Sequence, residues 1–123
     1  MAEPQHTHIQ PEIWKPIPNY EGIYEVSNYG RVKSCTREIR YTNKFGTEIK
    51  HPVRGRILAV RTRSNGYQYV DLWKRNKGEQ RTVHSLVLEA FIGPRPEGYV
   101  CCHYDDVRTN NYVGNLRWGT YSD

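Results

Sequence analysis

The feature that most constrains this chain is a series of turn-forming groups rich in Gly and Asn, which divide residues 23–83 into short segments. The strand-like runs near these groups have four to seven residues, a length typical of β-strands, and cover residues 23–27, 31–34, 37–42, 47–53, 56–62, 67–73 and 80–83. Gly supplies the positive φ that tight hairpin turns require. The sequence therefore predicts antiparallel hairpins around four turns: Asn28-Tyr29-Gly30, Asn43-Lys44-Phe45-Gly46, Ser64-Asn65-Gly66 and Lys77-Gly78-Glu79.

The hydrophobic period changes after these hairpins. Five apolar residues have the spacing of one helix face: Val83, Leu86, Val87, Ala90 and Phe91. Gly93-Pro94 then ends the predicted helix. Two short strands, Gly98–His103 and Leu116–Trp118, flank a polar loop. The predicted fold class is therefore α+β, with a strand-rich antiparallel N-terminal part, one central helix and a C-terminal hairpin.

Length and composition exclude several classes of protein. A chain of 123 residues corresponds to one domain, and three Trp, ten Tyr and two Phe argue for a folded core. No apolar run approaches the length of a transmembrane span, and residues 1–6 lack the basic and apolar regions of a secretory signal. The odd count of three Cys, two of them adjacent, argues against a disulfide scaffold and favours a reducing compartment.

Positive charge is concentrated in the middle of the chain. Residues 31–81 carry fourteen Lys or Arg against four acids, whereas the formal net charge of the whole chain is only +5. Rows of cations on a sheet are typical of a phosphate-binding surface, although a solvated face that maintains solubility is the alternative. The candidate DNA-binding cations of this region are Arg31, Lys33, Arg37, Arg40, Arg54, Arg56, Arg61, Arg63, Lys74, Arg75 and Lys77.

A histidine lies at the end of the predicted strand Gly98–His103. The polar loop that follows it is rich in Asn and Asp. A hairpin around such a loop can hold the His103 imidazole against the carbonyl or amide of a facing Asn, which would orient it to accept a proton from water. A surface polar cluster without catalytic function is the alternative.

Three other features are expected to be structural. The face that Tyr67, Tyr69 and Trp73 share is expected to pack against the helix, with stacking on bases as the alternative. His84 is expected to pack against the core or to cap the helix. The cysteines lack the paired spacing of a structural zinc site, so no zinc is expected.

Two stretches of the chain resemble nuclease sequences. The downstream stretch contains Val83-His84-Ser85-Leu86-Val87, Cys102-His103-Tyr104-Asp105, Asn110-Asn111 and Asn115-Leu116-Arg117-Trp118. The upstream stretch contains Trp14-Lys15-Pro16-Ile17, Tyr24-Glu25-Val26-Ser27-Asn28 and Gly30-Arg31-Val32-Lys33-Ser34. The downstream stretch is similar to the HNH endonucleases of the phage and homing type, and the upstream stretch resembles the modular DNA-binding motif that often precedes an HNH domain.

The resemblance implies a metal-dependent endonuclease that hydrolyses phosphodiester bonds of double-stranded DNA, by nicking or by cleavage of both strands. It implies that His103 is the general base and that Asn115 orients its imidazole. The implied fold of this part is a ββα-metal (His-Me finger) hairpin that binds one divalent cation, Mg²⁺ or Mn²⁺. Cys102 occupies the position of the family's Asp or Asn ligand, Asp105 is a weaker candidate ligand, and Arg117 is a further DNA contact.

The chain departs from the family pattern at this implied metal site. Thiolate sulfur at Cys102 is a poor ligand for Mg²⁺, which prefers oxygen. The final helix of the ββα unit, which carries the second metal ligand, is expected beyond Asp123. Three explanations stay open: a truncated nuclease, a catalytically incomplete relative that binds double-stranded DNA, or a non-standard ligand such as Asp105, Asp106 or Asp123.

The expected organisation has three parts. Residues 1–11 form a flexible leader, residues 12–80 form a basic strand-rich DNA-binding module, and residues 81–123 form an HNH nuclease domain that is incomplete at its C-terminal end. The expected protein is a monomer or homodimer without membrane association, acting in the cytoplasm of a bacterial or phage-infected cell.

Overall fold

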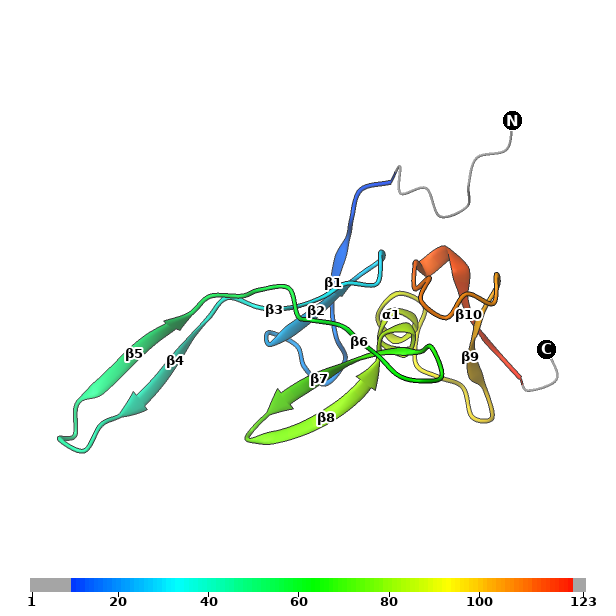
Figure 1. The fold of residues 1–123 in the computed structure, drawn as a ribbon. Helices are drawn as coiled ribbons and strands as arrows, with labels where there is room; N and C mark the ends of the chain where they lie inside the picture. Colours follow the sequence, from blue (N-terminus) through cyan, green and yellow to red (C-terminus); the bar gives the residue numbers. More distant parts are fainter. Residues whose placement is uncertain (1–9, 121–123) are drawn as a thin grey trace.

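The computed structural model describes residues 10–120, which form antiparallel sheets around a single helix (Figure 1). Within this part of the chain, the strands belong to four small sheets, with the strand orders β1-β2-β3, β4-β5, β6-β7-β8 and β9-β10. The α+β class predicted from the turns and the hydrophobic period is confirmed. Of the predicted leader, residues 1–9 lie outside the described residues.

Two three-stranded sheets form the N-terminal part. The first contains β1 (Trp14–Pro16), β2 (Tyr24–Ser27) and β3 (Val32–Ser34). The second contains three strands that hairpins connect: β6 (Arg61–Thr62), β7 (Gln68–Lys74) and β8 (Lys77–Thr82). The turns at residues 28–30 and 64–66 lie where the sequence predicts hairpins, and Gly30 and Gly66 adopt positive φ there. The turn predicted at residues 77–79 is misplaced: the chain turns at Arg75 and Asn76, which adopt positive φ, and residues 77–79 belong to β8.

The predicted strand over residues 56–62 is shorter than expected. Ile57 forms only an isolated bridge with Lys33, and Leu58 donates its backbone N–H to Val32. The segment then leaves β3 and becomes β6 only at residues 61–62. This short contact links the two N-terminal sheets.

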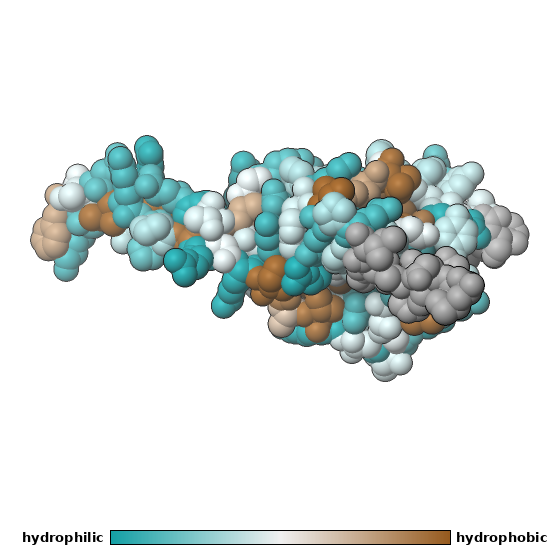
Figure 2. Space-filling model, turned by 90° about the horizontal axis from the view of Figure 1, so that it is seen from above, coloured by the Kyte–Doolittle hydropathy of each residue, from teal (hydrophilic) through white to brown (hydrophobic). Residues whose placement is uncertain are grey.

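Strands β4 (Arg37–Thr42) and β5 (Glu48–Val53) form a two-stranded arm that projects from the rest of the fold (Figure 1). Every residue of β4 is exposed, and the phenyl ring of Phe45 at the tip is 80% exposed. Seen from above, the surface of the arm is mostly hydrophilic (Figure 2). A two-stranded ribbon with no core of its own is only marginally stable by itself, so the arm depends on the body to which it is attached.

The helix α1 (Val83–Phe91) organises the core. Thr82 precedes it in extended conformation, and Gly93 ends it by donating its N–H to the Leu88 carbonyl. Leu86 and Val87 are fully buried. The helix packs against β1, β2, β7 and β8 and also against the C-terminal hairpin, so one core joins the N-terminal and C-terminal parts.

The expected packing of Tyr67, Tyr69 and Trp73 against the helix holds only for Tyr67, whose ring lies 5.0 Å from that of His84 in α1, and the expectation that the shared face forms the core is wrong. Val70 and Leu72, on the opposite face of β7, are the buried residues, and the Trp73 indole is 57% exposed. Strand alternation correctly separates the two faces, but it does not by itself say which face meets the helix.

The C-terminal hairpin contains β9 (Val100–His103) and β10 (Leu116–Gly119), with the 3₁₀ helix η1 (Val113–Asn115) immediately before β10. The loop of residues 104–112, called the Asn loop below, connects β9 to η1. Residues 121–123 lie outside the described part, so the predicted position of Asp123 has no structural account. No helix among residues 10–120 has the length and apolar character needed to cross a membrane.

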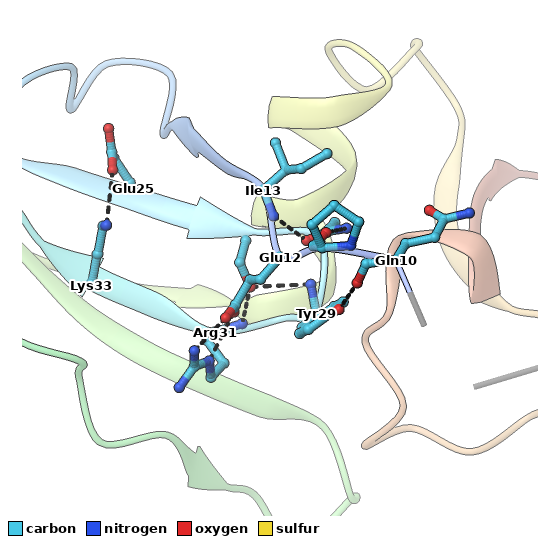
Figure 3. Close-up of polar contacts among 10 residues, drawn as sticks. Gln10, Glu12, Ile13, Glu25, Tyr29, Arg31 and Lys33 are labelled. Atoms are coloured by element: carbon cyan, nitrogen blue, oxygen red, sulfur yellow. Dashed lines mark hydrogen bonds and ion pairs between the residues drawn. The ribbon is translucent and has the colours of Figure 1, made fainter. Parts of the chain in front are cut away.

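Buried Asn28 joins the beginning of the described chain to this hairpin. Its side-chain oxygen accepts the Ile13 N–H at 2.7 Å, and its backbone carbonyl accepts the Val113 N–H at 2.9 Å. Figure 3 shows Ile13, Tyr29 and Gln10 of this region, with the hydrogen bond from the Tyr29 hydroxyl to the Gln10 carbonyl. The turn that follows β2 is thereby fixed against the start of η1, which follows the Asn loop.

Gly30 has no room for a side chain. It has a φ of +88°, and a Cβ at this position would lie 2.9 Å from the Asn111 Cβ. We expect Gly30→Ala to lower the free energy of unfolding by about 2–3 kcal/mol, because left-handed strain adds to the displacement of Asn111. Urea unfolding followed by circular dichroism measures this change.

Gly22→Ala is the matched control. Gly22 has a similar φ of +80°, but a Cβ added there would meet nothing within 4 Å, so only the backbone strain of about 1 kcal/mol applies. Equal losses of stability in the two variants would contradict the close packing of Asn111 on Gly30.

Candidate active site

His103 lies at the end of β9, on the edge of the core. The ladder pairs His103 with Leu116 and Cys101 with Trp118, so these four side chains share one face of the hairpin. Leu116 on that face is buried, whereas the His103 side chain is half-buried. The imidazole is therefore anchored by the core and still reaches the surface.

A buried asparagine holds the imidazole. His103 Nε2 lies 2.9 Å from Asn111 Oδ1, and Asn111 is only 3% exposed. The Asn111 amide in turn donates from Nδ2 to Gln68 Oε1 at 3.0 Å. A facing Asn from the polar loop therefore contacts His103, as the sequence predicts.

The specific assignment of this role to Asn115 is wrong. Position 115 lies opposite Tyr104 rather than His103, because side chains alternate along the strand and Leu116 pairs with His103. The Asn115 amide instead donates to Asp105 Oδ1 at 2.9 Å and to the Asn110 carbonyl at 2.9 Å. Asn115 thus closes the Asn loop, and its backbone carbonyl accepts the Tyr104 N–H.

Asp105 belongs to the same loop-closing network. Its carboxylate accepts hydrogen bonds from Asn110 at 2.8 Å and from the Val107 backbone at 2.8 Å, in addition to the bond from Asn115. The hydrogen bond from Asn110, followed by the one from Val107, lowers the pKa of the Asp105 carboxyl to about 2. The carboxylate is therefore ionised, but its oxygens already serve the backbone and side chains of its own loop.

The residues predicted as metal ligands do not form a metal site. Cys102 Sγ contacts the Val100 carbonyl at 3.8 Å, and Asp105 is directed into the loop. Among residues 10–120, no group of three or more His, Cys, Asp or Glu side chains could hold a metal ion. A thiol and a fully hydrogen-bonded carboxylate are an unsuitable donor set for Mg²⁺ or Mn²⁺.

Two aromatic rings enclose the inner side of His103. The His84 ring meets it edge to face at a centroid distance of 5.2 Å, and the Tyr67 ring lies 6.1 Å away. His84 is buried, as expected, and its Nδ1 has no hydrogen-bond partner. Burial, with a smaller contribution from His103, lowers the pKa of His84 to about 4, so its imidazole is neutral at pH 7.

A pocket of about 470 Å³ opens beside His103. Its lining includes Cys102, Asp106 and two arginines, Arg108 and Arg117. Arg108 lies over the Tyr67 ring at 4.6 Å and hydrogen-bonds to the Asn65 carbonyl, which docks the Asn loop on the β6–β7 turn. The sequence predicted Arg117 but missed Arg108, Asn111 and Gln68.

The predicted DNA-binding cations lie at the surface but do not form one cluster. Arg31 pairs with Glu12 and lowers the pKa of that carboxyl, while Lys33 lies 3.5 Å from Glu25 (Figure 3). Arg40 and Arg61 also lie near carboxylates, those of Glu38 and Asp71. Two of the predicted cations, Lys33 and Lys74, are half-buried. Six further predicted cations are exposed: Arg37, Arg54, Arg56, Arg63, Arg75 and Lys77.

The exposed cations lie in two regions, the base of the β4–β5 arm and the sheet of β6, β7 and β8. Arg37 begins β4, and Arg54 and Arg56 follow β5, so these three guanidinium groups lie around the base of the arm. Arg63 follows β6, where it lies over the Tyr69 ring at 4.6 Å and donates to Gln80 at 3.0 Å. Arg75 lies in the turn between β7 and β8, and Lys77 begins β8.

Two family models match the chain, the NUMOD4 motif over residues 12–73 and the HNH endonuclease over residues 81–123. The chain belongs to the NUMOD4-containing HNH endonucleases. It is 37% identical over 107 residues to the DNA endonuclease I-HmuI of Bacillus phage SP01, across 87% of this chain and 52% of that protein. It is thus homologous to a phage HNH endonuclease and spans about half its length.

The fold also matches a solved structure. The structure that describes DNA binding and cleavage by the HNH homing endonuclease I-HmuI aligns with a TM-score of 0.69 and 35% sequence identity. The alignment covers 89% of this chain and 53% of the I-HmuI chain. The expected resemblance to phage and homing HNH endonucleases is therefore confirmed for sequence and for fold.

The buried His84 makes stability depend on pH. Its pKa is about 4 in the folded chain against an ordinary value of 6.5, so between these values the unfolded chain binds the extra proton. We expect the free energy of unfolding to fall as the pH drops from about 6.5 to about 4, by roughly 2–3 kcal/mol in total. Urea unfolding at several pH values measures this loss.

His84→Phe keeps a ring in the core but removes the titrating group, so its stability should be less sensitive to pH in this window than that of the parent chain. The exposed His51 of the arm provides the control, since His51→Gln should retain the parental dependence. A His84→Phe variant with the parental pH dependence would show that His84 is not the group responsible.

Proposed function

We propose that this chain provides the DNA-binding part and the general base of an HNH-type endonuclease, which hydrolyses phosphodiester bonds of double-stranded DNA. One observation carries the proposal. The His103 imidazole is held by Asn111 at the edge of a pocket that Arg108 and Arg117 also line. A base beside two cations is the combination that attack of water on a phosphate diester requires.

The pocket residues have distinct proposed roles. His103 takes the proton from the attacking water, because a neutral imidazole is an effective base near neutral pH. Arg108 and Arg117 bind oxygens of the scissile phosphate, since guanidinium groups pair well with phosphate. Asn115 and Asp105 keep the loop closed and have no direct contact with the reacting atoms in this proposal.

HNH endonucleases generally depend on a divalent metal ion, and we propose Mg²⁺ or Mn²⁺ for this protein. Such an ion would supply charge stabilisation at the phosphate. Cys102 and Asp105 do not form a site for it among the described residues, so these two positions are not proposed as its ligands.

The proposed DNA surface combines the arm with the second N-terminal sheet. Arg37, Arg54 and Arg56 at the base of the arm, and Arg63 beside β6, are exposed and carry no carboxylate partner among the ion pairs of residues 10–120. A projecting cationic β-ribbon has the dimensions to enter a groove of duplex DNA. Arg31, Lys33, Arg40 and Arg61 would contribute less, because each already faces a carboxylate.

The proposed DNA-binding surface and the proposed catalytic pocket lie in different parts of the chain. We propose a DNA-binding module over residues 12–80 and an HNH nuclease domain over residues 81–123, which share the core around α1. Monomer and homodimer both stay open. Because the I-HmuI relative comes from a Bacillus phage, we propose that the protein acts in the cytoplasm of an infected bacterium.

A second candidate function is DNA binding without cleavage. The observation that favours it is the donor set, since Cys102 is a thiol and the Asp105 oxygens are occupied within the loop. In this alternative the cationic surface is retained, whereas His103 and Asn111 serve only to hold the Asn loop.

A plasmid-nicking assay with Mg²⁺ or Mn²⁺ separates the two functions. We expect cleavage by this chain or by a chimera that continues past residue 123 with the part of I-HmuI that follows the matched region. His103→Ala in the cleaving form should reduce the rate by about 10²–10⁴-fold, because the general base is lost. Glu97→Ala, in the exposed segment before β9, is the control and should cleave normally.

Three outcomes of the nicking assay are informative. Cleavage by the chimera only would show that residues beyond 123 complete the site. Cleavage by neither form, with DNA still retained in a gel shift, would support the second candidate. Full activity of His103→Ala would contradict the role of His103 as base.

Salt dependence tests the proposed DNA surface. We expect the affinity for a duplex to fall steeply between 50 and 200 mM salt, because each phosphate contact contributes about 0.9 to the slope of log K against log salt. The double variant Arg37→Gln and Arg54→Gln should bind more weakly on every sequence and lower the slope by about 1–2. Fluorescence anisotropy measures both quantities.

Arg95→Gln is the control for this experiment, because Arg95 lies outside the basic centre and donates to the Tyr99 carbonyl. Its slope should match that of the parent chain. A flat salt dependence, or an equal effect of Arg95→Gln, would exclude the arm as a phosphate-binding element.

A further inference from the structure

The two strands of the arm present one apolar and one polar face. In the β4–β5 ladder, residues directly opposite each other project to the same side of the ribbon, and side chains alternate along each strand. The first side, the apolar face of the arm, carries Arg37, Ile39, Tyr41, Ile49, His51 and Val53. The second side, the polar face, carries Glu38, Arg40, Thr42, Glu48, Lys50 and Pro52.

The apolar face is accessible to solvent. Within residues 10–120, β4 and β5 pair only with each other, and the hydrophobic core contains no residue of the arm. The Ile39 side chain is 39% exposed and that of Tyr41 is 53% exposed, while Ile49 is half-buried. Contiguous apolar surface on a folded protein commonly marks an interaction site. The apolar face of the arm is therefore a candidate interaction surface.

Hydrogen bonds at the base of the arm fix the direction in which it projects. Gly55 donates its N–H to Thr36 Oγ1 at 2.9 Å, and the Arg56 N–H donates to Ser34 Oγ at 3.1 Å. A Cβ at position 55 would lie 2.2 Å from the Ser34 carbonyl oxygen, so the two ends of the arm approach each other closely. The arm thus leaves the end of β3 as a supported ribbon (Figure 1).

Charge distinguishes the two faces of the arm. Both acids of the two strands, Glu38 and Glu48, lie on the polar face. The six residues of the apolar face include no acid, and Arg37 lies at the end of this face that is nearest the body. Arg54 and Arg56 follow β5 at the same end. A polyanion can therefore approach the apolar face without meeting a carboxylate of the arm strands.

The same charges disfavour a second copy of the chain as the occupant of this face. A symmetric pair of arms would place the apolar face against itself, and both copies would contribute a surface of the same positive sign. Double-stranded DNA instead carries negative charge along its whole length. Charge complementarity therefore favours a DNA duplex as the partner.

The major groove of DNA suits this face in size and in chemistry. The groove is about 12 Å wide and admits a two-stranded β-ribbon. The six residues of β4 extend over about 20 Å, which corresponds to about six base pairs. The apolar group that base pairs present in this groove is the C5 methyl group of thymine, and the minor groove presents no such group. Side chains such as Ile39 and Ile49 can contact that methyl group and bury it.

We infer that the apolar face of the arm lies in the major groove, where Ile39, Tyr41 and Ile49 recognise thymine through its methyl group. The inference rests on the proposed function, because it needs DNA as the partner. It extends that function by assigning a sequence preference to the arm, in addition to the phosphate contacts. Arg37, at the base of the same face, then contacts phosphates at the edge of the groove.

Removal of thymine methyl groups from a bound duplex tests the inference. Selection with the parent chain from a library of random duplexes first identifies a preferred sequence, and deoxyuridine then replaces thymine at one position after another. Deoxyuridine keeps the base pair and lacks only the methyl group. We expect the affinity to fall about fourfold at each contacted thymine, because one buried carbon group contributes about that factor. Fluorescence anisotropy measures the affinity.

Substitutions on the two faces of the arm identify the face that recognises the base. The double variant Ile39→Ser and Ile49→Ser removes apolar contacts and should bind the thymine and deoxyuridine duplexes equally. Its salt dependence should match that of the parent chain, because the arginines of the arm are unchanged. The matched control, Thr42→Ser and Pro52→Ser, changes one residue of each strand on the polar face and should keep the parental preference.

Backbone amide spectra of both double variants report whether the arm stays folded. If the Ile39→Ser and Ile49→Ser variant unfolds the arm, the deoxyuridine series on the parent chain still decides the inference. Three results would overturn it: affinity that deoxyuridine leaves unchanged at every position, a selection that returns no preferred sequence, and loss of the thymine preference in the polar-face control.

Two further outcomes concern the occupant of the face. Sedimentation velocity tests for a second copy: a dimer of the parent chain that the Ile39→Ser and Ile49→Ser variant dissociates would assign the apolar face to self-association and overturn the inference. A steep salt dependence without a thymine preference would overturn this inference alone. Absence of any duplex binding at low salt would overturn the proposed DNA surface as well, so the two proposals fail separately.

Discussion

The candidate site depends on two buried asparagines, Asn28 and Asn111, whose amides are almost completely removed from water and therefore need hydrogen-bond partners inside the protein. Asn28 bonds to Ile13 and, through its carbonyl, to Val113. Asn111 bonds to Gln68 and His103. Leaving either amide unsatisfied would cost about 1–3 kcal/mol. The Asn111 amide therefore holds the Asn loop against β7, whereas the Asn28 amide holds the segment of Pro11 and Ile13 against the turn after β2. The position of the His103 ring follows from that docking.

Charge is distributed so that binding and chemistry occupy different parts of the same small fold. The cations around the base of the arm are exposed, whereas Arg108 and Arg117 line the pocket beside His103. The inner side of the imidazole meets His84, which burial keeps neutral at pH 7. A neutral neighbour exerts no like-charge repulsion on the His103 imidazole. The fold thus places the uncharged His84 on the inner side of His103, the proposed base, and two arginines in the pocket beside it.

The sequence carried enough information to predict the fold class and to place His103, the proposed base, at the end of a strand. Turn groups with Gly at the required positive φ define the hairpins, and the helical spacing after Val83 defines the single helix of the described residues. These are local properties of the chain, and the structure keeps them. The same reasoning correctly expected a facing Asn for His103, because the loop between two short strands offered several.

Which residues meet across the fold was decided only by the tertiary structure. Asn111 rather than Asn115 holds His103, because the register of β9 and β10 turns position 115 toward the Asn loop. The sequence around Gln68 does not indicate its contact with Asn111, because the two residues are 43 positions apart. Alternation along β7 separated two faces, yet only packing on α1 showed that the face with Val70 is the buried one. Local periodicity determines what a segment becomes, whereas contacts between distant segments depend on register and packing, which no local pattern encodes.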